Sequence, residues 1–133
     1  MRCKLVVGNW KLNGSLQANA ALMSALAGRV ARRSDVTCAV CVPAVYLAQV
    51  AALAESSGSA IQVGGQDASR HELGAFTGEV AAAMLAECGA RYCIVGHSER
   101  RALFGDSDAV VAEKFGRIKA AGLMPILCVG ETL

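Results

Sequence analysis

One pattern recurs four times in this chain: an apolar run ends in glycine, and a polar residue follows at once. The residues that follow the glycines are Asn9, Gln66, His97 and Glu131. Each run is short and rich in β-branched residues, which is typical of a strand buried on both faces of a parallel sheet. Parallel strands bring their carboxyl ends to one edge of a sheet. The pattern therefore predicts that these four side chains, together with Lys11, surround one site.

Alanine-rich stretches with helical character separate the runs. We expect strands over about 4–9, 36–42, 60–65, 91–96 and 123–129. We expect helices over about 15–32, 44–56, 79–87 and 107–120, and a short helical turn at 98–102. The expected N-caps are Ser15 and either Asp106 or Ser107, and Pro43 suits the first position of the second helix. Gly89 and Gly122 are expected to end their helices. Alternating strands and helices predict an α/β fold with right-handed crossovers. An open doubly wound sheet and part of a closed (β/α) barrel both fit.

Length and charge limit the class of protein. The 133 residues, 54% of them hydrophobic, suffice for a single domain over 1–133 with its own core. A net charge of +2 without a basic block argues against a nucleic-acid partner. No apolar run reaches the ~18 residues of a membrane span, and Met1 leads almost directly into the first strand. We therefore expect a cytoplasmic protein with no membrane partner.

The six cysteines form no C-x-x-C pair. Five fall in or beside expected strands and one on an expected helix, namely Cys3, Cys38, Cys41, Cys93 and Cys128, and Cys88. We expect reduced core thiols and not disulfides or a zinc site. No glycine-rich nucleotide fingerprint occurs, so neither a metal nor a nucleotide cofactor is expected.

His97 follows a strand and a glycine and precedes an expected helix start at Ser98. Backbone N–H groups at that helix start are expected to donate to the imidazole, which disfavours the imidazolium. A neutral ring would then be able to donate to a substrate oxygen. A structural histidine is the alternative interpretation.

Lys11, which follows the first strand, is a candidate for neutralising an anionic substrate, and Asn9 for orienting it. We expect the flanking Trp10 and Leu12 to anchor the lysine backbone; a solvated rim residue is the alternative. Glu99 is expected to pair with Lys11 or carry protons, although a carboxylate in a first helical turn can simply complement the helix dipole.

Four motifs stand in order along the chain: GNWKLNG at 8–14, GAFTGE at 74–79, GHSERR at 96–101 and CVGETL at 128–133. Together they resemble the triosephosphate isomerase family from residue 4 to residue 133. The resemblance implies a (β/α)8 barrel, of which about the first five strands and four helices are present. It also implies cofactor-free interconversion of dihydroxyacetone phosphate and glyceraldehyde 3-phosphate in glycolysis and gluconeogenesis.

The resemblance assigns roles to matching positions. Lys11 resembles the lysine that binds and stabilises the phosphorylated substrate, and Asn9 resembles its polar neighbour. His97 resembles the neutral electrophile that polarises the carbonyl and stabilises the enediolate. Glu99 resembles the glutamate that contacts the lysine. His97, Lys11 and Glu99 are thus implied to be catalytic, with Asn9 and Lys11 binding the triose phosphate.

The resemblance also implies a homodimer. Residues 66–78 are expected to form a long polar loop. Thr77 resembles the tip that docks into the partner subunit, with Phe76 and Glu79 beside it in the interface. An exposed aromatic side chain at Phe76 would add little to the stability of a monomer, which favours an interface at this loop. A mobile surface loop is the alternative.

The match departs from the family in one respect. The general-base glutamate and lid on the sixth strand's loop, and the phosphate loops after strands seven and eight, are not found in these residues. Such a barrel usually needs ~250 residues. Glu131 matches a different place in the family and is not the base. We expect the chain alone to be inactive. Two alternatives stay open: a self-contained open-sheet module with at most weak anion binding, and a non-functional fragment that associates through exposed edges.

Overall fold

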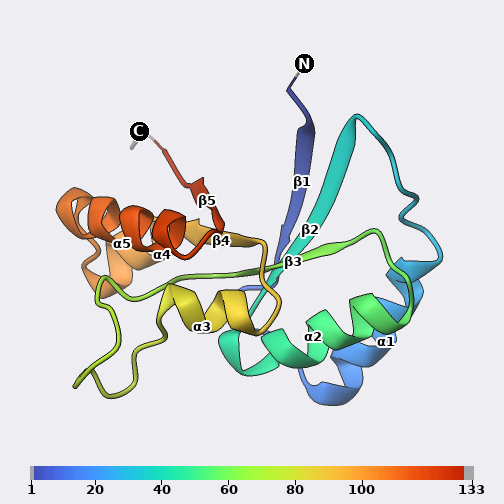
Figure 1. Ribbon diagram of the computed structural model, residues 1–133, viewed down its shortest axis with the longest axis horizontal. Coiled ribbons are helices and arrows are strands. Elements are labelled where there is room, and N and C mark those ends of the chain that lie inside the picture. The colour runs from blue at the N-terminus through green and yellow to red at the C-terminus, as the bar shows by residue number, and fades with distance from the viewer. Residues whose placement is uncertain (1, 131–133) are drawn as a thin grey trace.

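The computed structural model describes residues 2–130 (Figure 1). The sheet strands are β1 (Lys4–Asn9), β2 (Val36–Val42), β3 (Gln62–Gly65), β4 (Tyr92–Val95) and β5 (Met124–Leu127). The helices are α1 (Leu16–Ala27), α2 (Ala44–Ser56), α3 (Ala82–Glu87), α4 (Ser98–Phe104) and α5 (Asp108–Ala120). No helix in this part of the chain has the length and apolar character to cross a membrane.

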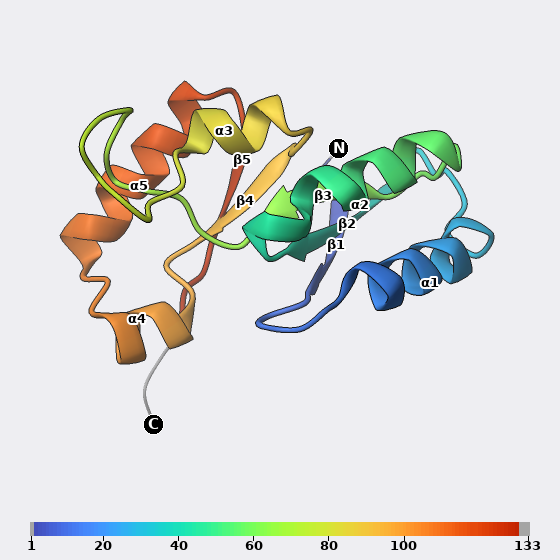
Figure 2. The same ribbon diagram turned by 90° about the horizontal axis from the view of Figure 1, so that it is seen from below.

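All strand pairs are parallel, and the order across the sheet is β1-β2-β3-β4-β5. A doubly wound sheet would reverse direction at a switch point, and this order has no reversal. The sheet curls, and α1, α2, α3 and α5 lie along its outer side (Figures 1 and 2). Of the two architectures open from the sequence, the curled half of a barrel is the one observed.

The core lies between the outer face of the sheet and the helices. Leu47 and Val50 of α2, Ile118 of α5, and Val42 and Val95 of the sheet are fully buried. The buried residues of α2 recur at helical spacing because one face of this helix packs on the sheet, whereas the last four residues of β2 are buried continuously.

The two edge strands are much less covered than the central ones. Val6 of β1 is 59% exposed and Met124 of β5 is 60% exposed, although both are large apolar residues. Barrel closure is the usual way to remove such edges. Among the described residues, the curled sheet thus keeps two edges with exposed apolar side chains.

The element bounds agree with the sequence expectations except at a few ends. Helix α1 stops at Gly28, so the expected extension to residue 32 is wrong and the following arginines lie beyond it. Helix α3 starts three residues later than expected, because the Val80 carbonyl is used by the Ser69 N–H. The expected turn at 98–102 is a full helix, which ends at the left-handed Gly105. The expected N-caps Ser15 and Ser107 are confirmed by their hydrogen bonds.

The cysteines divide by position. Cys41 and Cys93 are buried, as expected of core thiols, and burial raises the pKa of the Cys41 thiol to about 12. Cys3 and Cys88 are exposed, so the expectation of core thiols is wrong for these two. Cys3 lies before the uncovered edge strand β1, and Cys88 follows the last turn of α3.

Gly64 lies in β3 and is paired with Cys41 of β2 on one side and Tyr92 of β4 on the other. A Cβ on it would lie 2.8 Å from Cys41 Sγ and 2.8 Å from the Tyr92 carbonyl oxygen. Because a backbone oxygen can yield only by parting β3 from β4, we expect Gly64→Ala to lower the free energy of unfolding by about 1–3 kcal/mol. Gly116→Ala is the matched control, because that site in α5 is open and alanine favours helix by about 0.5–1 kcal/mol. Urea unfolding measures both; equal stability of the Gly64 variant and the parent would contradict the packing described here.

Candidate active site

The carboxyl ends of β1, β3 and β4 open onto one cleft of about 400 Å³. Asn9, Lys11, Gln66 and His97 line it, together with Glu99. The prediction that the polar residues after the strands gather at one site is confirmed for these four positions. Glu131, the last residue of that pattern, lies outside the described residues.

Lys11 and Glu99 form an ion pair across the cleft, with Nζ 2.7 Å from Oε1. The pair joins the loop after β1 to the first turn of α4. The hydrogen bond from Lys11 lowers the pKa of the Glu99 carboxyl. Both side chains are about half exposed, so the pair fixes orientation more than it stabilises the fold.

The backbone at Lys11 adopts a left-handed conformation, with φ at +54°. This is uncommon for a residue with a side chain and needs local support. The Asn9 side-chain oxygen accepts from the Lys11 N–H at 2.9 Å, and Gln66 Nε2 donates to the Lys11 carbonyl at 2.8 Å. Gln66 thus helps to hold the backbone of Lys11. The sequence pattern placed Gln66 at the site but did not identify this role.

Trp10 and Leu12, the two residues that flank Lys11, differ in burial. The Trp10 N–H donates to the Cys41 carbonyl at 3.0 Å, and its side chain packs against the core. Leu12 is 95% exposed, so the expectation that it anchors the lysine backbone is wrong. Side-chain amides supply the support that was expected from an apolar neighbour.

His97 caps the N-terminus of α4. The Glu99 N–H donates to His97 Nδ1 at 3.1 Å, as the sequence predicted for a helix start. Glu99 Oε2 lies 3.7 Å from the same nitrogen and would pair with it only if the ring were charged. Because the amide proton points at Nδ1, that atom presents its lone pair, and the ring hydrogen of the neutral form is on Nε2.

The turn that leads from β4 into His97 is tightly built. Gly96 has φ at +71°, and a Cβ there would lie 2.8 Å from an Arg101 nitrogen and 2.9 Å from Val111. Arg101 Nε donates to the Gly96 carbonyl at 2.7 Å. The glycine before His97 is therefore required by both backbone conformation and space.

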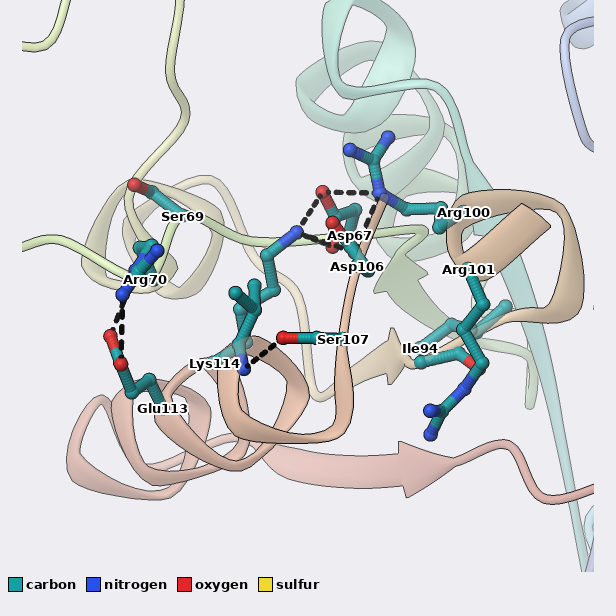
Figure 3. A network of polar contacts seen from close by, with 12 residues as sticks. Asp67, Ser69, Arg70, Ile94, Arg100, Arg101, Asp106, Ser107, Glu113 and Lys114 are labelled. Carbon is teal, nitrogen blue, oxygen red and sulfur yellow. Dashed lines mark hydrogen bonds and ion pairs between the residues drawn. The ribbon is translucent and has the colours of Figure 1, made fainter. Parts of the chain in front are cut away.

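A cluster of two carboxylates and two cations borders the cleft, which its members Asp67 and Arg100 help to line (Figure 3). Lys114 Nζ contacts both oxygens of Asp67 at 3.0 Å and Asp106 Oδ2 at 2.8 Å. Arg100 Nε lies 3.0 Å from Asp67 and 3.1 Å from Asp106. Lys114 and Asp106 are buried, and Asp67 is largely covered. Sequence reasoning missed this cluster.

The pKa values of the two carboxyls in the cluster are shifted in opposite directions. Burial raises the pKa of Asp67, and the contacts with Lys114 and Arg100 offset only part of that rise. Burial also acts to raise the pKa of Asp106, but its contacts with the same two cations outweigh this and lower it. One signal for the cluster was available: Lys114 falls on the buried stripe of α5, between Val111 and Ile118.

The loop expected to form an interface lines the cleft near both of its ends, through residues 66–69 and 78–79. Glu79 lines the cleft, and its Oε1 accepts from Ser69 Oγ at 3.1 Å. Thr77 is exposed and Phe76 is 42% exposed, outside the residues that line the cleft. Phe76 stacks on His71 with ring centroids 3.8 Å apart. The loop protrudes from the body of the molecule (Figure 1).

Known proteins resemble this chain along nearly its whole length. The family model described as triosephosphate isomerase matches residues 4–133. A protein named triosephosphate isomerase from Azoarcus sp. (strain BH72) is 62% identical over the whole chain, which covers 52% of that relative. One with the same name from Paracidovorax citrulli is 59% identical over 98% of the chain and 52% of its own length.

A solved structure is also similar. The crystal structure of triosephosphate isomerase from Bartonella henselae superposes with a TM-score of 0.89 at 37% identity. The match covers 97% of this chain and 52% of that structure. The chain thus spans about half the length of the curated relatives it matches.

Removing the ammonium of Lys11 should release the Glu99 carboxyl. We expect Lys11→Met to raise the pKa of Glu99 toward its ordinary value of 4.5, because the largest cause of its lowering is lost. In the parent, the pair is intact above that value and is lost as the pH falls through the lowered pKa. Carbon NMR of labelled glutamate reports this titration. Glu113, held by Arg70, is the internal control and should not change; an unchanged Glu99 titration would show that Lys11 does not hold it.

Proposed function

Because this chain belongs to the triosephosphate isomerase family, we propose that it supplies half of an active site that interconverts dihydroxyacetone phosphate and glyceraldehyde 3-phosphate. The observation that carries the proposal is one juxtaposition: a Lys11–Glu99 ion pair beside a histidine whose Nδ1 is already occupied as an acceptor. These groups lie at the carboxyl ends of a curled parallel sheet, where barrel enzymes place their chemistry.

Lys11 supplies positive charge to the substrate in this proposal. Its side chain is 55% exposed in the cleft, within reach of an incoming anion. A charge-assisted contact to a phosphate or to an enediolate oxygen is stronger than a neutral one. Asn9, whose side-chain oxygen holds the Lys11 N–H, presents the lysine and completes the binding side of the cleft.

His97 acts as the electrophile. With Nδ1 accepting from the Glu99 N–H, the remaining ring hydrogen on Nε2 is the donor to the substrate carbonyl oxygen. A donor held in place stabilises the negative charge that develops on this oxygen as the enediolate forms. Glu99 contributes at two points, through its backbone to His97 and through its carboxylate to Lys11.

Proton abstraction needs a carboxylate that the described residues do not offer. The described carboxylates that line the cleft are Asp67, Glu79 and Glu99, and each already accepts a hydrogen bond from another side chain. In this proposal the general base is the one that the family resemblance places on the sixth strand's loop, in the part of the barrel that these residues do not include. Residues 1–133 constitute one domain-sized unit of that barrel.

The partner in this proposal is a second copy of the same protein, in the cytoplasm. Phe76 and Thr77 are exposed at the tip of a protruding loop, while Glu79 at its base reaches the cleft. Docking the tip beside the partner's Asn9 and Lys11 would cover Phe76 and also order the lysine loop.

We expect activity only when the barrel is complete. The completed protein for this test is residues 1–133 joined to the part of the Azoarcus relative that lies beyond the match. It should turn over glyceraldehyde 3-phosphate in a coupled assay, whereas the 133-residue chain alone should not exceed background. In the completed protein, His97→Gln should lower kcat/KM by about 10²–10⁴-fold, because a positioned donor is lost.

The control for that assay is Arg33→Ala, which removes only an exposed contact with Asp35 beyond the end of α1. This variant should retain parental kinetics. Isomerase turnover by the chain alone at a rate comparable to the completed protein would refute the missing-base argument. Parental kinetics for His97→Gln would remove this residue from the mechanism.

The loop prediction concerns assembly. Deleting residues 72–78 from the completed protein should convert a dimer into a monomer with greatly reduced activity, because the exposed tip is removed. Sedimentation at micromolar concentration measures the change. Leu22→Gln, which alters an exposed apolar side chain on α1, is the control and should remain dimeric. A dimeric deletion variant would place the interface elsewhere.

A further inference from the structure

Helix α4 carries the candidate chemistry, yet it is poorly anchored by apolar packing. It has seven residues, none of them buried, and its exposed apolar side chains include Leu103 and Phe104. Short helices have little intrinsic stability. Since His97 caps this helix and Glu99 lies in its first turn, the position of α4 sets the geometry of both. Polar contacts must supply what burial does not.

Arg100 joins α4 to the charged cluster, in addition to the contacts that Glu99 makes with Lys11 and Arg101 makes with Gly96 and Asp108. Arg100 Nε lies 3.0 Å from Asp67 Oδ2 and 3.1 Å from Asp106 Oδ2. Asp67 follows directly after Gln66, at the end of β3. Asp106 also donates its backbone N–H to the Arg100 carbonyl at 3.1 Å. The guanidinium therefore ties the helix to the strand end that also carries a cleft residue.

Lys114 fixes the two carboxylates from the other side. It rises from α5, is 5% exposed, and contacts three carboxylate oxygens (Figure 3). Two cations thus face two anions, and the cluster is balanced in charge. A buried balanced cluster adds little net stability but favours one arrangement over others. Its effect is expected in the geometry of α4 more than in the stability of the fold.

We propose that Asp67 is a positioning residue for the candidate active site: it acts through Arg100 to fix α4, and through α4 the relation of His97 to Glu99 and Lys11. The proposal rests on the proposed function for its kinetic consequence, whereas its structural consequence is independent of activity. Asp67 does not bind substrate in this role. Its carboxylate is engaged by Lys114 and Arg100.

Asp67→Asn is the sharpest single change. Lys114 contacts both oxygens of Asp67, so an amide of the same shape places its nitrogen donor against either the ammonium or the guanidinium. The cluster also loses one of its two negative charges. We expect α4 to shift, and a displacement of even 1 Å can cost about 10²-fold in rate. In the completed protein kcat should fall about tenfold or more, with KM changing much less.

Asp108→Asn is the matched control. Asp108 also gives a carboxylate to an arginine of α4, with Arg101 Nη1 2.6 Å from Oδ1, but it is 96% exposed and lies outside the cluster. The same chemical change should leave kcat within about twofold of the parent, as is usual for exposed ion pairs. The comparison separates the buried cluster from the mere presence of an ion pair on α4.

A double-mutant cycle tests the route through Arg100. If Asp67 acts through this residue, Asp67→Asn combined with Arg100→Gln should lower kcat no more than the larger single change. Additive losses would overturn the proposed route. If Asp67→Asn does not fold, Arg100→Lys replaces it, because lysine keeps the charge but has no Nε to bridge the two carboxylates; unchanged kcat in this variant would equally overturn it.

A second readout does not depend on isomerase activity. The Glu99 amide proton, which donates to His97 Nδ1, should shift in proton–nitrogen NMR spectra of the 133-residue chain in Asp67→Asn and remain in place in Asp108→Asn. If the amide shifts but the completed parent has no isomerase activity, the proposed function fails and the positioning role stands. If the parent is active and Asp67→Asn changes neither kcat nor this amide, the positioning role is wrong.

Discussion

Each strand of the sheet is hydrogen-bonded to the strand next to it in the sequence and runs in the same direction. This sequential parallel pairing brings the ends of β1, β3 and β4 to one edge and leaves α1, α2, α3 and α5 on the outer side (Figure 2). The cleft exists because of this arrangement, since its polar residues come from separate loops that share only this edge. Because crossovers between parallel strands are right-handed, few other chain topologies are compatible with this pairing.

Much of the fold could be predicted from local signals. The glycine-terminated runs located four of the five strands, while β2 was recognised from an apolar run that ends at Pro43. Ser15 and Ser107 marked helix starts through their own backbone contacts. The contact between the Glu99 N–H and His97 was predictable for the same reason, because the two residues are only two positions apart in the sequence. Where the signal was weaker, as at the end of α1, a glycine ended the helix before the apolar pattern ran out.

The polar framework of the site was less predictable, because it depends on contacts between distant segments. Nothing local to Asp67 indicates that α5 will place an ammonium on it, and Gln66 gains its role only from the left-handed backbone at Lys11. Leu12 shows the reverse: an apolar residue beside a functional lysine was expected to anchor it and is exposed instead. Only Lys114, on the buried stripe of its helix, carried a readable sign.

The separation in sequence between the contacting groups also bears on how the molecule forms. Lys11 meets Glu99 across 88 positions, Gln66 meets Lys11 across 55, and Lys114 meets Asp67 across 47. Contacts of this range are made only after the intervening chain has lost its freedom, and they slow folding. Helices and single strand pairs can therefore form while the cleft does not yet exist. We therefore expect the site to be assembled late in folding and to be lost early when the sheet opens.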